Sequence, residues 1–300
     1  MTGLYALIRR NIKLYFKDKG MFFTSLITPL ILLVLYATFL ANIYEDSFRS
    51  AIKAAGMTVS DRVVWGCVGG ELVSSLLAVC CVTVAFCSNT LMVQDKYTGA
   101  RKDLTVSPVR PGTLALGYYA ATFASTLIIG LCTLGVCLLY LARVGWFLTF
   151  FDVMFLILDV FLLVLFGTAV SSCLLLPFNT QGQASAVGTV VSAGYGFLCG
   201  AYMPISNFSD GLQKVLSFLP GTYGTSLLRN HAMRGVFEEM RSLGIPDPVM
   251  ETVRDSVDCN LYFFGEKVSL GAMYAVLTGA TALAIGLYIG LHFLLSRKRK

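Results

Sequence analysis

Six long stretches of mostly apolar residues recur along this chain of 300 residues, and they restrict its fold more than any other feature. A helix needs about 20 residues to cross a hydrocarbon core of roughly 30 Å. The chain is 13% charged, whereas soluble domains carry about 25% charged residues. The sequence therefore predicts an all-α polytopic membrane protein with six transmembrane helices. The predicted spans are Met21 to Ile43, Trp65 to Val93, Leu114 to Leu141, Phe151 to Leu176, Gln183 to Met203 and Val268 to Leu295.

Basic residues beside the predicted spans indicate how the chain is oriented. They gather before the first span, between the second and third spans, and at the end of the chain. These groups are Arg9 to Lys19, Lys96 to Arg110 and Arg297 to Lys300. Because Lys and Arg are enriched in short cytoplasmic segments, we expect a multi-pass protein of a bacterial cell membrane with both termini cytoplasmic. The net charge of +6 is then explained by orientation, and no nucleic-acid partner is predicted.

The chain is expected to form one membrane domain over residues 1–300, with three notable segments outside the spans. Residues 1–20 place apolar and basic side chains on separate faces at helical spacing. This pattern predicts a helix lying at the inner membrane surface, although an ordinary basic flank is an alternative. Residues 94–111 form a cytoplasmic loop, and residues 204–267 form an outer segment. Residues 44–64 are predicted to be a short outer loop.

The outer segment begins with an apolar stripe that is too short to cross the membrane. The stripe runs from Phe208 to Leu219 and stops before Pro220, which interrupts helices. It predicts an outer re-entrant helical hairpin between the fifth and sixth spans. Beyond Gly235 the chain turns polar as far as about Glu266, which predicts a small exposed insertion.

The sequence lacks the motifs of several catalytic sites. A phosphate-binding loop ends in Gly-Lys followed by Ser or Thr, and the chain contains no Gly-Lys pair. The HExxH and GxSxG patterns are also absent. Eight of the nine cysteines lie within the spans, where adjacent Cys80 and Cys81 cannot easily converge on one ion, so we interpret them as packing residues. The chain is therefore predicted to be a non-catalytic protein that holds no cofactor or metal of its own.

Two carboxylates are candidates for a role inside the membrane, where an isolated charge is costly. Glu71 lies near the outer end of the second span, and Asp159 lies roughly 12 Å into the fourth. Asp159 is a candidate for a proton or sodium relay in a stand-alone carrier or channel. Alternatively, it simply bonds to neighbouring helices or faces a wet cavity. Both interpretations place Asp159 against protein rather than lipid.

The stretch QDKYTGARKDLTVSPVRP, residues 94–111, is a compact basic elbow between two spans. Thr98 and Gly99 break the preceding helix, ARKDL forms one or two helical turns, and Ser107-Pro108 ends them. A rigid projection of this kind suits docking on a soluble partner. A plain loop with orientation charges is the other interpretation.

Taken in order, these features resemble the ABC-2 family of transporter permeases. In that family an acidic-basic pair after the second span is followed by Gly, a Leu-rich turn and Ser/Thr-Pro-Val. The corresponding residues here are Asp95-Lys96, Gly99, Leu104 and Ser107-Pro108-Val109. Tyr97 departs from the family, which often has Glu there. The family's outer Pro, short re-entrant hairpin, Pro-x-Tyr-like step and Leu-Arg pair are similar to Pro204, the stripe, Pro220 to Tyr223 and Leu228-Arg229.

The resemblance implies the membrane half of an ATP-driven exporter. Such a permease would pair with a second copy or a related permease, and with two ABC ATPase subunits that hold the ATP and Mg. The residues expected to couple to the ATPase are Asp95, Lys96, Gly99, Arg101, Lys102, Leu104, Ser107 and Pro108. The residues expected at the outer gate are Phe208, Leu212, Leu216, Pro220 and Tyr223.

The cargo is inferred from the spans expected to line a pathway between two protomers. Parts of spans one, two and five would line it, and they are rich in Phe, Leu, Gly and Thr with little charge. This composition favours an amphipathic or lipid-like cargo, such as a drug, a peptide antibiotic or a lipid-linked molecule. A polysaccharide or its lipid-linked precursor is the alternative, with Phe22, Phe23 and Tyr36 as stacking surface. Membrane lipid is the remaining expected partner.

Overall fold

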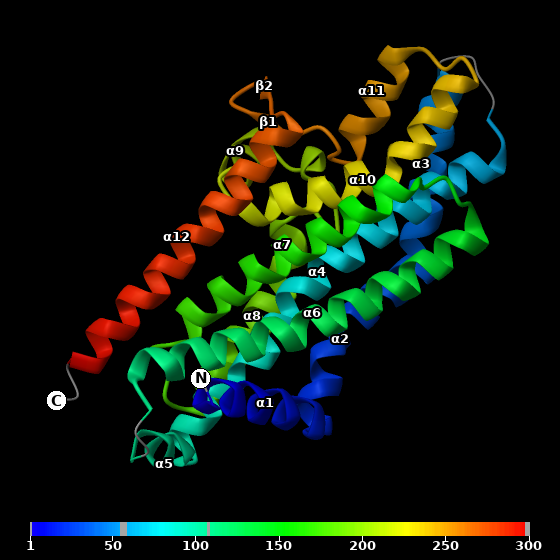
Figure 1. Ribbon diagram of the computed structural model, residues 1–300. Coiled ribbons are helices and arrows are strands. Elements are labelled where there is room, and N and C mark those ends of the chain that lie inside the picture. The colour runs from blue at the N-terminus through cyan, green and yellow to red at the C-terminus, as the bar shows by residue number, and fades with distance from the viewer. Residues whose placement is uncertain (1, 55–58, 107–108, 298–300) are drawn as a thin grey trace.

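The computed structural model describes residues 2–54, 59–106 and 109–297, and it shows an elongated bundle of long helices (Figure 1). The elements in chain order are α1 (Thr2–Lys17), α2 (Lys19–Leu35), η1 (Tyr36–Leu40), α3 (Ala41–Ala54), α4 (Asp61–Tyr97), α5 (Ala100–Val106), α6 (Pro111–Val144), α7 (Phe150–Leu175), α8 (Gln181–Leu198), η2 (Ile205–Asn207), α9 (Asp210–Leu216), α10 (Pro220–Ser242), α11 (Asp247–Ser256), β1 (Tyr262–Phe263), β2 (Glu266–Lys267) and α12 (Leu270–Arg297). The strands β1 and β2 form a small antiparallel hairpin.

Helix α4 is the centre of the bundle. It is 37 residues long and packs against α2, α6, α7, α8 and α10. Two of its glycines permit close contacts, because a Cβ at Gly70 would lie 2.6 Å from Met233 Cγ and a Cβ at Gly66 would lie 2.7 Å from the Phe147 ring. Small residues let helices approach closely. The glycines of α4 therefore allow α10 and the α6–α7 connection to pack directly on this helix.

Five helical stretches among the described residues are long and apolar enough to cross a membrane. They are Lys19–Ser50, Asp61–Tyr97, Pro111–Val144, Phe150–Leu175 and Leu270–Leu294. These stretches confirm the predicted all-α polytopic class and correspond to the first four predicted spans and the sixth. The fifth predicted span corresponds to α8, which has 18 residues and so measures about 27 Å. Because α8 is not among the five, the count of six spans stays a prediction.

The first membrane helix is longer than its apolar run. Helices α2, η1 and α3 follow one another from Lys19 to Ala54, so residues 44–54 are helical and the prediction of an outer loop there is wrong. The reason is amphipathic packing. Tyr44 and Phe48 of α3 are buried, and α3 packs against α4 and α11 despite its polar composition. The intervening η1 is a π-helix, a rare geometry that often occurs at functional positions.

The segment predicted to lie outside, residues 204–267, is more structured than its composition indicates. Helix α10 continues through Gly235 to Ser242, and α11 and the β1–β2 hairpin follow, so the prediction of a plain exposed insertion is wrong. Met250 and Val253 of α11 are buried. Their spacing of three residues places them on one helix face, a pattern that is concealed by the polar residues between them. Helices α9 and α10 occupy the predicted re-entrant hairpin, whose depth in a membrane stays a prediction.

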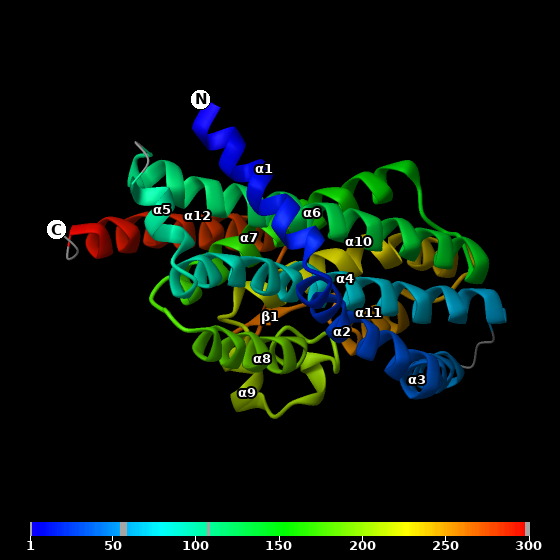
Figure 2. The same cartoon turned by 90° about the horizontal axis from the view of Figure 1, so that it is seen from below.

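The start of α1 and the end of α12 lie at the same end of the bundle as α5, and α3 and α11 lie at the other end (Figure 1). Helix α1 crosses α4 and α6 near the α5 end (Figure 2). Leu7, Asn11 and Tyr15 of α1 are buried at intervals of four residues, whereas Arg9 and Lys13 are exposed. An amphipathic helix is therefore present over Thr2–Lys17, and its buried face contacts the bundle. Its position at the inner membrane surface stays a prediction.

We expect Gly235→Ala to lower the melting temperature of the protein. The added Cβ would collide with the carbonyl oxygen of Phe147, a backbone atom that cannot rotate away. Overpacking of this kind costs about 1–3 kcal/mol. Gly279→Ala in α12 is the matched control, because nothing lies within 4 Å of its Cβ. Equal melting temperatures of the two variants in detergent would contradict the packing of α10 on the α6–α7 connection.

Candidate functional site

The carboxyl-terminal end of α4 turns into α5 through a glycine. Helix α4 ends at Tyr97, Thr98 follows as its cap, and Gly99 has a φ of +87°. Side chains disfavour positive φ, so glycine is the residue that permits this turn. The Lys102 N–H then donates to the Gly99 carbonyl at 2.8 Å and starts α5. The helix break therefore lies where the sequence predicts it.

Asp95 joins three helices at this end of α4. Arg10 of α1 donates from Nη1 to Oδ2 at 2.7 Å and from Nη2 to Oδ1 at 2.9 Å, and the Tyr118 hydroxyl of α6 also donates to Oδ2. Paired charge-assisted hydrogen bonds of this kind are strong. The bond to Asp95 raises the pKa of the Arg10 guanidinium above its ordinary value. Asp95 is buried, and it holds α1 and α6 to α4.

Lys96 ties the same end of α4 to the α7–α8 connection. Its ammonium donates to the Phe178 carbonyl at 2.8 Å and also to the Leu176 carbonyl. Helix α7 ends at Leu175, and the last carbonyl groups of a helix lack helical partners and attract cations. Asp95 and Lys96 thus connect the attachment point of α5 to α1, α6 and the α7–α8 connection.

The other predicted coupling residues are distributed around the elbow. Arg101 is half-buried, Lys102 is exposed, and Leu104 packs against the hydrophobic core. Ser107 and Pro108 lie outside the described residues. The structure therefore brings Asp95, Lys96, Gly99, Arg101, Lys102 and Leu104 to one end of the bundle. Contact of these residues with an ATPase stays a prediction.

In the opposite half of the bundle, a buried arginine joins two carboxylates. Arg229 of α10 donates from Nη2 to Glu71 of α4, and from Nη1 to Asp258 at 3.2 Å. The three side chains are 1%, 0% and 4% exposed, respectively. Asp258 also accepts hydrogen bonds from the backbone N–H groups of Ile205 and Ser206. The Arg229 cluster, meaning Arg229, Glu71 and Asp258, therefore connects α4, α10 and two outer connections.

The Arg229 cluster is incompletely satisfied. It contains two carboxylates and one guanidinium, and neither Glu71 Oε2 nor Arg229 Nε has a hydrogen-bond partner among the described residues. The hydroxyl of Tyr36, which lies within electrostatic range of Glu71, also lacks a partner within the described chain. Buried polar groups without partners are costly. Because Tyr36 is the first residue of the π-helix η1, the irregular turn of the first span lies beside this cluster.

A second buried cluster joins α7, α10 and α12. Asp159 Oδ2 lies 2.6 Å from His231 Nδ1, and the Tyr274 hydroxyl donates to Asp159 Oδ1 at 2.6 Å. The His231 ring stacks on Phe155 with centroids 4.8 Å apart. Asp159 is fully buried, which confirms the prediction that it faces protein. Each of its oxygens has a partner within the chain, and a relay role for Asp159 stays a prediction.

The predicted outer-gate residues do not form one cluster. Leu216 and Tyr223 are buried, and the Tyr223 hydroxyl donates at 2.6 Å to the carbonyl of the residue after Leu216. Leu212 is exposed on α9, Phe208 is half-buried before α9, and Pro220 begins α10. The structure therefore joins two of the five residues, and the gate role of the set stays a prediction.

Two of the pairings in these clusters were not predictable from local sequence. Arg229 and Glu71 are 158 residues apart, and Asp95 and Arg10 are 85 residues apart. One signal is present, because Arg229 follows the apolar pair Leu227-Leu228 and a buried arginine needs a carboxylate. That signal indicates an acidic partner for Arg229 but does not identify Glu71 or Asp258.

Together, the long apolar helices, the ion pairs buried between them and the helical elbow at one end define a polytopic helical membrane protein. A family model described as "ABC-2 type transporter" matches residues 2–232. The chain therefore belongs to the ABC-2 type transporter family, whose members are membrane components of transporters that associate with an ABC ATPase. No curated protein matches the chain.

Proposed function

We propose that this chain is the membrane-spanning permease of an ATP-driven exporter, with two ABC ATPase subunits docked at a cytoplasmic α5. The observation that supports this function most is the attachment of α5. The two charged residues at its base, Asp95 and Lys96, bind α1, α6 and the α7–α8 connection. A displacement of α5 would therefore act on several helices at once.

ATP would drive transport by favouring one arrangement of these helices. A ligand shifts a conformational equilibrium only as far as it prefers one state, and closure of the ATPase pair would provide that preference by moving α5. The Arg10–Asp95 pair would pass the motion to α1. Helix α4, which packs on most of the bundle, would carry it to the Arg229 cluster and α10.

A second permease copy would pair with the exposed apolar faces of α2 and α8, and the pathway would lie between the two protomers. Phe23 and Val34 of α2 and Val190 of α8 are prominent on these faces. Span two was expected to line the pathway, and this does not fit the structure. Of the residues in an apolar 18-residue stretch of α4, 83% are buried inside the protomer. The proposed pathway therefore involves spans one and five.

The proposed cargo is an amphipathic or lipid-like molecule, because the exposed face of α2 is apolar and α8 adds Ser, Thr and Gly. The alternative polysaccharide cargo has less support from the structure than from the sequence. Tyr36, one of its three expected stacking residues, is 1% exposed and faces the protein interior, while Phe23 stays exposed.

Co-purification and reconstitution test the proposed function. We expect an ABC ATPase to co-purify from native membranes. Proteoliposomes holding both proteins should export rhodamine 6G or an NBD-labelled phospholipid only when ATP is supplied. Transport of the same probes by the chain alone, driven by an ion gradient without ATP, would overturn the proposal in favour of an ion-coupled carrier.

We expect Asp159→Asn to lower thermal stability by about 1–3 kcal/mol and to leave ATP-driven export intact. Asparagine keeps an oxygen for the Tyr274 hydroxyl but loses the charge that faces His231. The measurement is probe export per ATP hydrolysed, with Asp247→Asn, an exposed outer carboxylate, as the control. Loss of export together with a new ion requirement would assign Asp159 to a relay instead.

A further inference from the structure

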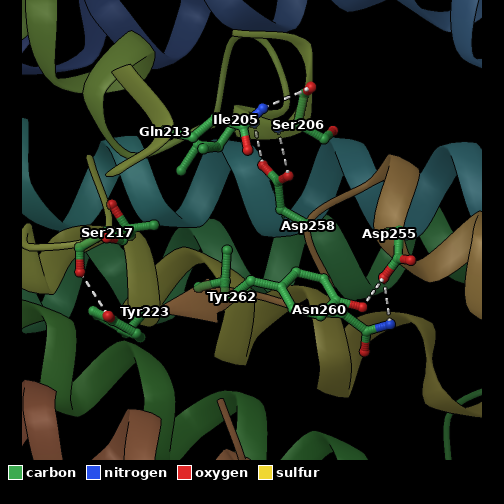
Figure 3. Close-up of a pocket in the computed structure, with 11 residues that line it drawn as sticks. Ile205, Ser206, Gln213, Ser217, Tyr223, Asp255, Asp258, Asn260 and Tyr262 are labelled. Carbon is green, nitrogen blue, oxygen red and sulfur yellow. Dashed lines mark hydrogen bonds between the residues drawn. The ribbon is translucent and has the colours of Figure 1, made fainter. Parts of the chain in front are cut away.

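A cavity of about 280 Å³ lies in the half of the protein opposite α5. One wall comes from residues 205–223, around α9 and the start of α10, and the other comes from residues 255–262 between α11 and β1 (Figure 3). The second wall lies beyond the residues 2–232 that match the ABC-2 family model. The cavity is therefore formed only in part by the matched family region.

The wall formed by residues 255–262 presents acceptors. The Asn260 amide donates to Asp255 at 2.7 Å and to Glu251 at 2.9 Å, which uses both of its N–H groups. The Tyr262 hydroxyl donates to Asp255 at 3.1 Å. The remaining polar atoms of these side chains are oxygens. A ligand in the cavity therefore meets acceptors on this side (Figure 3).

The opposite wall has the same character. The Gln213 amide donates to two backbone carbonyls, and the hydroxyls of Ser217, Thr222 and Tyr223 each donate to a backbone carbonyl. A side-chain hydrogen bond also joins Ser206 to Asp258. A ligand must consequently supply nearly all of the donors itself.

The charge of the cavity is negative. Asp255 has no cationic partner within 4.0 Å among the described residues. The guanidinium that faces Asp258 also serves Glu71. The nearby Lys267 is bound to Glu251 at 2.7 Å and lowers the pKa of that carboxyl. The second nearby cation, the Arg254 guanidinium, is also paired with Glu251.

A group of exposed aromatic side chains adjoins the cavity. Phe218 and Phe263 follow two lining residues directly in the chain, and their ring centroids are 5.3 Å apart. Phe264 lies 4.9 Å from Phe263 by the same measure. Phe218 and Phe264 are 61% and 63% exposed. This phenylalanine group offers an apolar surface beside an acidic, acceptor-rich cavity.

From these features we infer that the cavity binds the ammonium head group of an amphiphile, whose apolar chain rests on the phenylalanine group. An ammonium carries a positive charge and several donors but no acceptor, which complements both walls. Pockets for whole drug-sized ligands measure about 300–1,000 Å³, so this cavity suits a head group. This binding does not depend on the proposed export function and is measurable on the chain alone.

Binding to the protein in phosphatidylcholine nanodiscs tests the inference. Calorimetry should show that n-octylammonium binds the unmodified chain more tightly than octan-1-ol. Asp255→Asn should weaken octylammonium binding at least about tenfold, because a hydrogen bond to a charged group contributes about 1.5–3 kcal/mol. Asp247→Asn, which removes an exposed carboxylate at the other end of α11 from Asp255, should bind like the unmodified protein. Equal binding of octylammonium and octanol, or unchanged binding by Asp255→Asn, would overturn the inference.

A second variant keeps the test valid if Asp255→Asn is unstable. Phe218 is exposed, so Phe218→Ala should fold normally. This variant should reduce the ratio by which octylammonium binds more tightly than butylammonium. An unchanged ratio would show that the phenylalanine group is not part of the site. Nanodiscs that contain phosphatidylethanolamine distinguish the source of the ammonium. Weaker octylammonium binding in these nanodiscs would show that phosphatidylethanolamine competes, and would indicate a lipid head group as the ligand. Unchanged binding would indicate a free amine, and either result supports an ammonium site.

Discussion

Arg229→Met is expected to destabilise the protein by about 3–5 kcal/mol, the cost of removing one partner from a buried ion pair. Methionine fills similar space but leaves Glu71 and Asp258 without a counter-charge in a region where both are buried. Since native domains are stable by only about 5–15 kcal/mol, much of the folded protein should be lost. Thermal unfolding in detergent, followed by size-exclusion chromatography, measures this loss.

The charges themselves can be tested by a rescue experiment. Adding Glu71→Gln and Asp258→Asn to Arg229→Met should restore part of the lost stability, because neutral side chains are less costly to bury than unpaired charges. Asn is suited to position 258, where φ is +52°. Arg241→Met, at an exposed pair with Asp247, should cost only about 0–1 kcal/mol. A triple variant no more stable than Arg229→Met would show that shape, rather than charge, sets the cost.

The features that could be predicted from sequence are those dictated by the membrane and by special backbone residues. Lipid admits only segments that satisfy their own backbone hydrogen bonds, so long apolar runs such as Trp65 to Val93 identify helices without further information. Gly99 marks the end of α4 for a similarly local reason, because the turn there requires a positive φ. The class of protein and the position of the elbow follow from these local rules.

The features that could not be predicted depend on contacts between distant segments. The polar composition of residues 235–266 conceals an α10 that packs along α4, α7 and α12. Asp95 and Lys96 lie in the elbow by sequence, yet their side chains are directed into the bundle to Arg10 and the Phe178 carbonyl. Such pairings are set by helix packing. The order of residues along the chain does not indicate that Asp95 pairs with Arg10 or Lys96 with the Phe178 carbonyl.

Asp95→Asn is expected to uncouple ATP hydrolysis from export in the reconstituted complex. The variant removes the charge that holds Arg10 of α1 at the base of α5, while leaving α5 itself available to the ATPase. ATP hydrolysis should continue. Probe export per ATP should fall at least about tenfold if the Arg10–Asp95 pair lowers the activation free energy of export by about 1.4 kcal/mol. Parallel measurements of phosphate release and rhodamine 6G export in proteoliposomes give this ratio.

A double-mutant cycle separates transmission from simple destabilisation. If Arg10 and Asp95 act as one unit, Arg10→Gln should reproduce the effect of Asp95→Asn, and the double variant should be no worse than either single variant, because interacting sites are not additive. Asp95→Glu, which keeps the charge, should retain part of the coupling. Tyr118→Phe removes only the hydroxyl donor and should have a smaller effect. If export and hydrolysis instead fall in proportion in every variant, the Arg10–Asp95 pair stabilises the α5 end of the bundle, and the proposed motion of α5 must be transmitted by other contacts.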